Sequence, residues 1–173
     1  MHSELPLECR CVDRREHLQR PFAEQALDLL PHRRDLAYEA RSDALFIYAE
    51  TEFALERPLR ILKEMYGESL DIEPPTIRYR TSHVIEEPHM AVRVLCAARH
   101  FASLKDDFLA RGAAILDEEL RPPVGVIRAT APLRELIGYS QWLAQHTSGS
   151  AREVMWLAHY APCEHPPIDA VSG

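Results

Sequence analysis

The sequence predicts an α+β protein of two small tandem domains, each with the element order β-α-β-β-α-β. The first observation behind this is the spacing of apolar residues, which switches between a period of two and a helical period in that order. The second is that the whole order occurs twice along the chain. The length of 173 residues also suits two compact domains of about 80 residues each.

The first half opens with a strand and a helix. A strand is expected over residues 7–12, where Cys9 and Cys11 share one face because they are two residues apart. Helical spacing follows and stops at Pro31. The buried stripe of this helix is expected to consist of Leu18, Phe22, Ala26 and Leu29.

A hairpin comes next, and an edge strand closes the first half. Two apolar runs, residues 36–40 and 44–49, are joined by Arg41-Ser42-Asp43, a composition typical of turns. Residues 70–80 are expected to form an edge strand, because two adjacent prolines interrupt them.

Between the hairpin and the edge strand lies a second helix, which ends at Gly67. An interior proline costs about 3 kcal/mol, so Pro58 predicts that this helix starts close to it or kinks there. Its buried stripe is expected to consist of Leu55, Leu59, Leu62 and Tyr66.

The second half repeats the order. Residues 88–96 alternate as a strand does, and the next helix ends at Gly112, a residue suited to a left-handed cap. Strands are expected over residues 113–118 and 124–131 around a proline-containing turn. The buried stripe of the helix that ends at Gly112 is expected to consist of Phe101, Leu104 and Phe108.

A last helix starts at Pro132, as helices often do at proline, and a last strand covers residues 153–160. Gly138 within this helix costs about 1 kcal/mol against alanine, which predicts that the backbone lies close to the sheet there. The inward side is expected to consist of Leu133, Leu136, Ile137, Ser140, Leu143 and Ala144.

Two copies of the split β-α-β unit define two tandem ferredoxin-like domains, expected over residues 1–82 and 83–173. In such a domain two helices cover one face of the sheet and the other face stays free. The scaffold hosts many functions and fixes none of them.

Composition and charge narrow the function classes. A formal net charge of −7 argues against a generic nucleic-acid binder, because nonspecific phosphate affinity needs clustered Lys and Arg, but it permits docking through a local basic face. No apolar run approaches the roughly 18 residues of a membrane span. The N-terminus lacks a secretory pattern, so we expect a cytoplasmic protein with its four cysteines reduced.

Basic side chains on the second helix and the strand after it form the best candidate surface, because such residues position proteins on RNA through phosphate contacts. They are Arg57, Arg60, Lys63, Arg78 and Arg80. The alternative is a solvated helix face on which Glu56 and Glu64 balance the cations through i, i+4 pairs.

Patterns for catalysis and metal binding are weak. Cys9 and Cys11 are too close in sequence for the usual zinc spacing, and no second ligand pair follows them. His100, His146 and His159 lie at expected element ends, where histidines are usually solvated. We therefore expect no metal, no cofactor and no enzymatic activity.

The last third carries a family resemblance. The run from Val126 to Tyr139, with Pro132-Leu133 and Gly138-Tyr139, is followed by Thr147-Ser148-Gly149 and by His159-Tyr160. This pattern resembles the fifth domain of translation elongation factor G, and Glu87-Pro88-His89-Met90 also fits. The resemblance implies Arg111 as an RNA contact before Gly112, although the family has three arginines where this chain has Leu109-Ala110-Arg111.

The first half is similar to the third domain of the same family, mainly over residues 44–66 and 75–80. The family's usual Gly-Met-Gly-Glu-Leu-His is reduced to Glu52 within residues 49–54. The GTPase, second and fourth domains have no counterpart, and no Gly-Lys-Ser/Thr phosphate loop is present. The direct junction of the two halves is also similar to the BipA and LepA translational GTPases.

The resemblance implies a non-catalytic module that binds the ribosome, through ribosomal RNA and ribosomal proteins, near the elongation-factor site. A second hypothesis is a protein-interaction domain that has kept the fold and lost ribosome binding, and that pairs with itself or with a separate GTPase. The missing arginines before Gly112 favour this second hypothesis. A third, an enzyme on the same scaffold, is disfavoured because no polar cluster converges.

Overall fold

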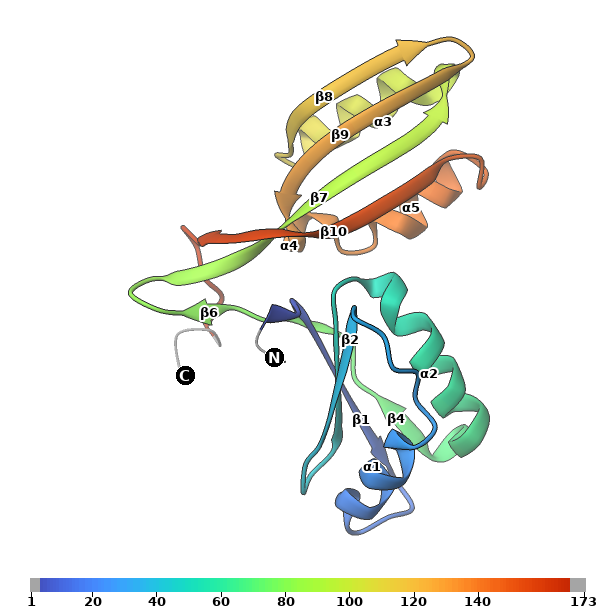
Figure 1. Ribbon diagram of the computed structural model, residues 1–173, viewed down its shortest axis with the longest axis vertical. Helices are drawn as coiled ribbons and strands as arrows, with labels where there is room; N and C mark the ends of the chain where they lie inside the picture. Colours follow the sequence, from blue (N-terminus) through green and yellow to red (C-terminus); the bar gives the residue numbers. More distant parts are fainter. Residues whose placement is uncertain (1–3, 169–173) are drawn as a thin grey trace. The chain divides into compact units, whose positions relative to one another are not determined.

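The computed structural model describes residues 4–168, and the chain forms two compact units, Met1–Arg78 and Tyr79–Gly173 (Figure 1). The division lies four residues before the junction expected after residue 82. The cause is a short hairpin that the sequence did not reveal, in which β6 (Arg80–Thr81) pairs with β7 (Ile85–Ala97) inside the second unit.

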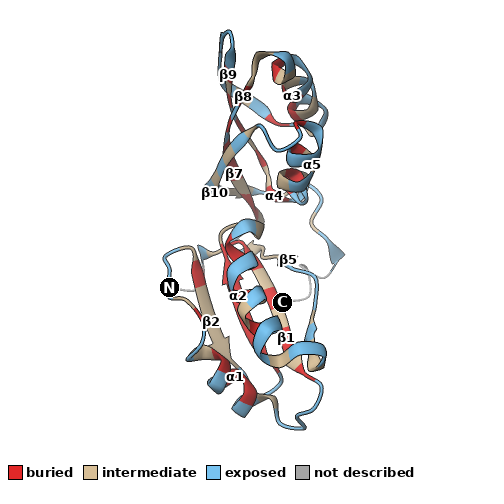
Figure 2. Ribbon diagram, turned by 90° about the vertical axis from the view of Figure 1, so that its right-hand side faces the viewer, coloured by how far each residue is buried: buried red, intermediate tan, exposed pale blue. Residues whose placement is uncertain are grey.

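The first unit is an antiparallel sheet with two helices on one face (Figure 2). The strand order is β2-β3-β1-β4, and β5 also pairs with β1. Its elements are β1 (Leu7–Asp13), α1 (Gln19–Leu27), β2 (Leu36–Ala40), β3 (Leu45–Ala49), α2 (Glu52–Tyr66), a 3-10 turn (Gly67–Ser69), β4 (Leu70–Ile72) and β5 (Thr76–Ile77).

The core of the first unit follows the expected strand faces. Leu7, Cys9 and Cys11 alternate along β1 and are fully buried, as their spacing predicts. Helix α1 is shorter than expected, because it begins only at Gln19 and ends at Leu27. Leu18 and Leu29 flank it and are 71% and 37% exposed, so their assignment to the buried stripe was wrong.

Helix α2 begins six residues before Pro58, so of the two expected alternatives, a start close to Pro58 or a kink there, the first is wrong. Thr51 caps it by accepting a hydrogen bond from the Ala54 amide at 3.2 Å. Pro58 is buried within the helix. The cap therefore sets the start of α2, and burial of the proline ring accompanies the lost backbone hydrogen bond.

The second unit repeats the topology, with strand order β10-β7-β9-β8 and β6 paired with β7. Helices again cover one face of its sheet (Figure 1). The remaining elements are α3 (Ala98–Ala110), β8 (Ala114–Arg121), β9 (Val124–Pro132), α4 (Leu133–Leu136), α5 (Tyr139–His146) and β10 (Arg152–Pro162). Both units thus have the β-α-β-β-α-β order, which confirms the ferredoxin-like class.

The last helix of the second unit is broken where the sequence predicts one continuous helix. Gly138 has φ +75° and separates α4 from α5, a left-handed conformation that favours glycine. A Cβ at Gly138 would meet no atom within 4 Å, so the expected close approach to the sheet was wrong. The break turns Ile137 outward, to 42% exposure, and leaves Ala144 exposed as well.

Candidate nucleic-acid interface

Helix α2 gathers three of the candidate cations. Arg57, Arg60 and Lys63 recur every three residues and share the exposed side of the helix. The opposite side packs into the core through Ala54, Leu55, Pro58 and Leu62. The amphipathic pattern of α2 therefore fixes where these three cations point.

The charges of this helix face are not neutralised by ion pairs. Within residues 4–168 none of Arg57, Arg60 and Lys63 forms an ion pair or a side-chain hydrogen bond, and Glu56 and Glu64 do not pair with them. Lys63 also lies in the last turn, where a cation interacts favourably with the helix dipole. The face is free to contact phosphate groups.

Arg78 and Arg80 lie elsewhere. Arg78 donates to the Leu5 carbonyl at 3.0 Å, and its guanidinium lies 4.5 Å from the ring centre of Tyr48 in the first unit. Arg80 belongs to the second unit and lies 3.8 Å over the ring of Tyr160. Arg78 thus packs on Tyr48 of β3 and not on α2, and Arg80 belongs to the other unit.

Arg111 is engaged within the second unit. Its Nε donates to the Asp107 carboxylate at 2.7 Å and its Nη1 donates to the Glu135 carbonyl at 2.8 Å. The same guanidinium lies 5.1 Å from the ring centre of Tyr139 and 5.5 Å from that of Trp142. These contacts tie the end of α3 to α4 and α5.

A second group of cations was not predicted from the sequence. Arg93 on β7, Arg128 on β9 and Arg152 on β10 are exposed, and strand pairing places them on the sheet face that the helices leave free. Arg93 and Arg128 each stand between two buried neighbours, a signal that could have assigned their face. The register between strands, which makes them neighbours, could not be read from the sequence.

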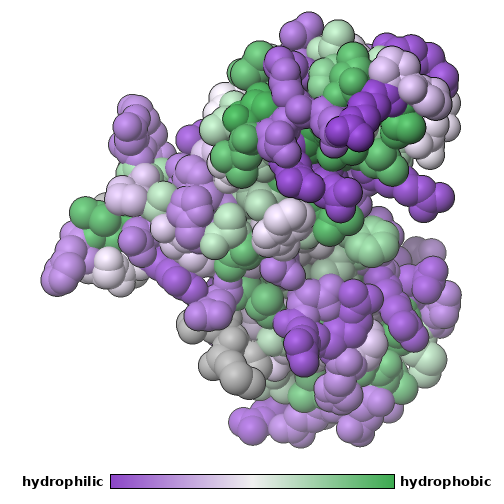
Figure 3. Space-filling view, turned by 45° about the horizontal axis from the view of Figure 1, so that its top comes forward, coloured by the Kyte–Doolittle hydropathy of each residue, from purple (hydrophilic) through white to green (hydrophobic). Residues whose placement is uncertain are grey.

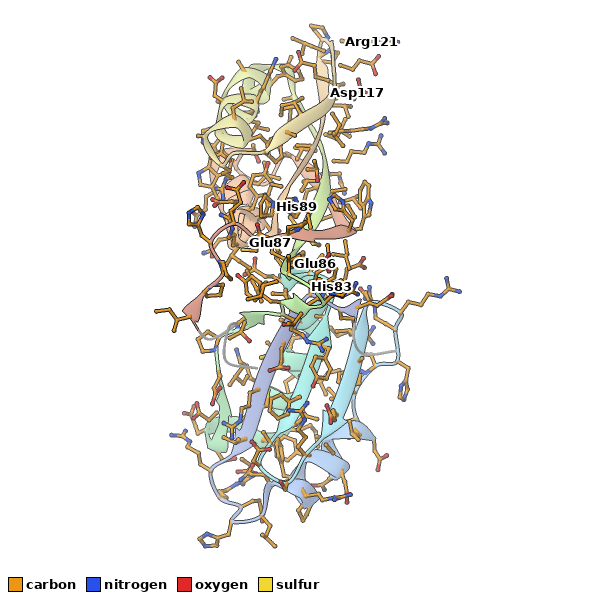
Figure 4. The ribbon with its side chains drawn as sticks, turned by 90° about the vertical axis from the view of Figure 1, so that its left-hand side faces the viewer. His83, Glu86, Glu87, His89, Asp117 and Arg121 are labelled. Carbon is orange, nitrogen blue, oxygen red and sulfur yellow. The ribbon has the colours of Figure 1, made fainter. Side chains whose placement is uncertain are left out.

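One cluster of titratable groups lies at the start of β7 (Figure 4). The buried Glu87 carboxylate accepts from Arg134 Nε at 2.8 Å, and His89 Nε2 lies 3.9 Å from it. His89 stacks on His159 with ring centres 5.1 Å apart. Burial lowers the pKa of His89, and the neighbouring carboxylate of Glu87 opposes this shift. The arrangement is an ion pair between a buried carboxylate and a half-exposed guanidinium, beside two imidazoles.

Other site types find no support in the described part of the chain. Among residues 4–168, no three metal-binding side chains come together, and no helix is long and apolar enough to cross a membrane. Hydrophobic side chains reach the visible surface of both units in small groups separated by hydrophilic ones (Figure 3).

Comparison with known proteins gives a family match in the second unit. The model for the elongation factor G C-terminus matches residues 84–171, just over half of the chain. Elongation factor G of Mycoplasma pneumoniae (strain ATCC 29342 / M129 / Subtype 1) is 36% identical over 80 residues, which cover 46% of this chain and 12% of that protein. Elongation factor G 2 of Hahella chejuensis (strain KCTC 2396) is 36% identical over 85 residues, which cover 49% of this chain and 12% of that protein.

A solved structure extends the likeness over nearly the whole fold. A crystal structure of a protein from Thermus thermophilus has a TM-score of 0.63 and 14% identity, covering 94% of this chain and 41% of that one. At this identity the likeness concerns the fold alone. The chain spans about 12% of the length of the curated relatives it matches, so the activity of those whole proteins does not carry over directly.

Proposed function

This chain belongs to the elongation factor G C-terminus family, and on that premise we propose that it is a non-catalytic translation-factor-like module that binds the ribosome near the elongation-factor site. The first unit, in this proposal, corresponds to the third domain of the factor and the second unit to the fifth. Binding positions the module on ribosomal RNA and ribosomal proteins, and no chemical step is needed.

The observation that carries the proposal is the unpaired basic face of α2. Arg57, Arg60 and Lys63 point outward from one helix with no ion pair to a residue of the described range 4–168. Lys and Arg contacts to phosphates orient a protein on RNA without reading its sequence. A local face of this kind supports docking despite the net charge of −7.

The test is co-sedimentation of the purified chain with 70S ribosomes across a salt series. We expect binding that weakens steeply with salt, because phosphate contacts release counterions. The variant R57E/R60E/K63E is expected to lose at least tenfold in affinity. A control with the same charge change on other exposed arginines, R20E/R34E/R99E, is expected to bind nearly as the parent does. Equal losses in both variants would contradict a role for the α2 face.

The second hypothesis, a protein-interaction domain that pairs with a separate GTPase, is favoured by one observation. Arg111, the residue implied as an RNA contact, directs its guanidinium to Asp107, Glu135 and two aromatic rings of its own unit. If the chain fails to sediment with ribosomes even at low salt, this hypothesis replaces the first.

A further inference from the structure

The free sheet face of the second unit carries two neighbouring arginines beside an exposed tryptophan. Arg93 on β7 stands directly opposite Arg128 on β9. On its other side Arg93 is opposite Val154 of β10, and the next rung along β10 and β7 holds Trp156 and Ala91. Side chains of directly paired residues share a face, so these groups form one continuous surface.

This surface exposes large apolar side chains to water. Trp156 and Val154 are 42% and 60% exposed, and Leu95, on the rung beyond Arg93, is 40% exposed. Each residue also lies in a regular strand, so its exposure follows from the fold and not from a frayed end. A ligand with an apolar, planar group would remove this area from water.

The charges of the surface are also unbalanced. Directly opposite like charges on a sheet are destabilising. Arg128 forms an ion pair with Asp117 of β8 at 3.4 Å, and the next acidic residue on the same side of β8, Glu119, pairs with Arg121 at 2.6 Å. Figure 4 shows Asp117 projecting from β8. Within residues 4–168, Arg93 and Arg152 form no ion pair or side-chain hydrogen bond. An anion between Arg93 and Arg128 would relieve this repulsion.

We propose that this sheet face binds single-stranded RNA, with a base stacked on Trp156 and the adjoining phosphate held between Arg93 and Arg128. Unpaired bases stack on aromatic side chains at about 1–3 kcal/mol per base, while arginines hold the backbone. Trp156 is the diagonal cross-strand neighbour of Arg93, and such neighbours lie about 7–8 Å apart, a separation that one nucleotide spans with its phosphate at the arginines and its base on the indole. The bases of a duplex are already stacked inside it and cannot reach the indole.

The inference does not rest on the ribosome-docking proposal. The surface lies in the second unit and uses none of the α2 cations. Free RNA binding and ribosome sedimentation are separate measurements, so either can fail without the other. With a net charge of −7 on the chain, binding is expected to be weak and strongly dependent on salt.

The test uses the full chain and fluorescein-labelled decauridylate and decaadenylate, followed by fluorescence anisotropy in 50 mM and 200 mM salt. We expect binding of both oligonucleotides at low salt, about tenfold weaker for Trp156→Ala and about tenfold weaker for R93Q/R128Q. Trp156→Phe and R93K/R128K keep the stacking and the charge, and are expected to retain most of the affinity. The control R20Q/R34Q removes the same charge from another surface and is expected to bind as the parent does.

Three outcomes would overturn the inference. One is no binding at 50 mM salt by a parent chain whose thermal unfolding shows that it is folded. Another is binding that Trp156→Ala and R93Q/R128Q leave unchanged. The third is binding of a labelled deca-glutamate peptide in place of RNA, which would mean that the surface takes an acidic protein segment.

Discussion

The two sheet faces that the helices leave uncovered differ in how their aromatic residues are protected. In the first unit Phe46 and Tyr48 lie on the central strand β3 and are only 7% and 2% exposed. Arg41 lies 4.3 Å over the ring of Phe46, and Arg78 lies 4.5 Å over that of Tyr48. In the second unit no such stack covers Trp156 among the described residues.

The difference shows that the same fold can present two free sheet faces with different chemical properties. The guanidinium groups of Arg41 and Arg78 form cation-π contacts with the rings of Phe46 and Tyr48 and shield these rings from water. On the second face the arginines stand next to one another and the indole stays accessible. The fold is the same in both units, so the side chains of the free face decide which of them is available for a ligand.

The largest effect that would sharpen this comparison is expected from truncating one aromatic residue on each face. Phe46→Ala is expected to lower the unfolding free energy of the first unit by about 3 kcal/mol, since it empties a buried site. Trp156→Ala should cost the second unit about 1 kcal/mol or less, because its side chain is already accessible. Urea unfolding followed by hydrogen exchange reports each unit separately. Similar losses in the two units would break the comparison.

A smaller effect is expected from removing one hydroxyl in each unit. Tyr48 Oη donates to the Glu39 carboxylate at 2.8 Å and accepts from Arg41 at 3.0 Å, so Tyr48→Phe should cost about 1 kcal/mol. The buried Tyr139 hydroxyl has no hydrogen-bond partner among the described residues. Tyr139→Phe is therefore expected to leave stability unchanged or raise it by up to about 1 kcal/mol. Thermal unfolding of the two variants measures this, and a clear loss for Tyr139→Phe would contradict it.

The smallest effect concerns pH, because the two units are expected to lose stability in different pH ranges. Burial lowers the folded-state pKa of His89, so its contribution is present above the unfolded value of about 6.5 and is lost as the pH falls through the folded value. The hydrogen bond from Arg15 lowers the pKa of Asp13, so the contribution of Asp13 is lost only below about pH 4.

Hydrogen exchange at pH 7.5, 5.5 and 3.5 checks this expectation. The second unit should weaken first, and His89→Gln should reduce its loss between pH 7.5 and 5.5. Asp13→Asn should leave that interval unchanged and affect the first unit near pH 3.5. The reverse order of the two units would contradict the assigned causes.

Strand faces were predictable from the sequence because a period of two is a local property. The burial of Cys9 and Cys11 and the pairing of residues 36–40 with 44–49 follow from spacing and turn composition. The break at Gly138 was not predictable in this way, since the apolar stripe on either side continues with helical spacing. Leu18 and Leu29 were misassigned because helix ends depend on backbone contacts and not on the stripe.

The candidate site was predictable only in part, for a different reason. Arg57, Arg60 and Lys63 share one helix, so their common face is set by local spacing. The distribution of Arg78 and Arg80 over two units, and the capture of Arg111 by Asp107 and Glu135, depend on contacts between distant segments. The neighbouring positions of Arg93 and Arg128 likewise depend on strand register, which composition does not fix.

Competition with elongation factor G for 70S ribosomes tests the central claim most directly. Labelled chain is bound to ribosomes at low salt, and elongation factor G is added together with a non-hydrolysable GTP analogue that holds the factor in place. We predict that the chain is displaced as the factor saturates its site, and that R57E/R60E/K63E reduces the initial binding. Binding of the chain that persists at saturating factor would contradict docking near the elongation-factor site.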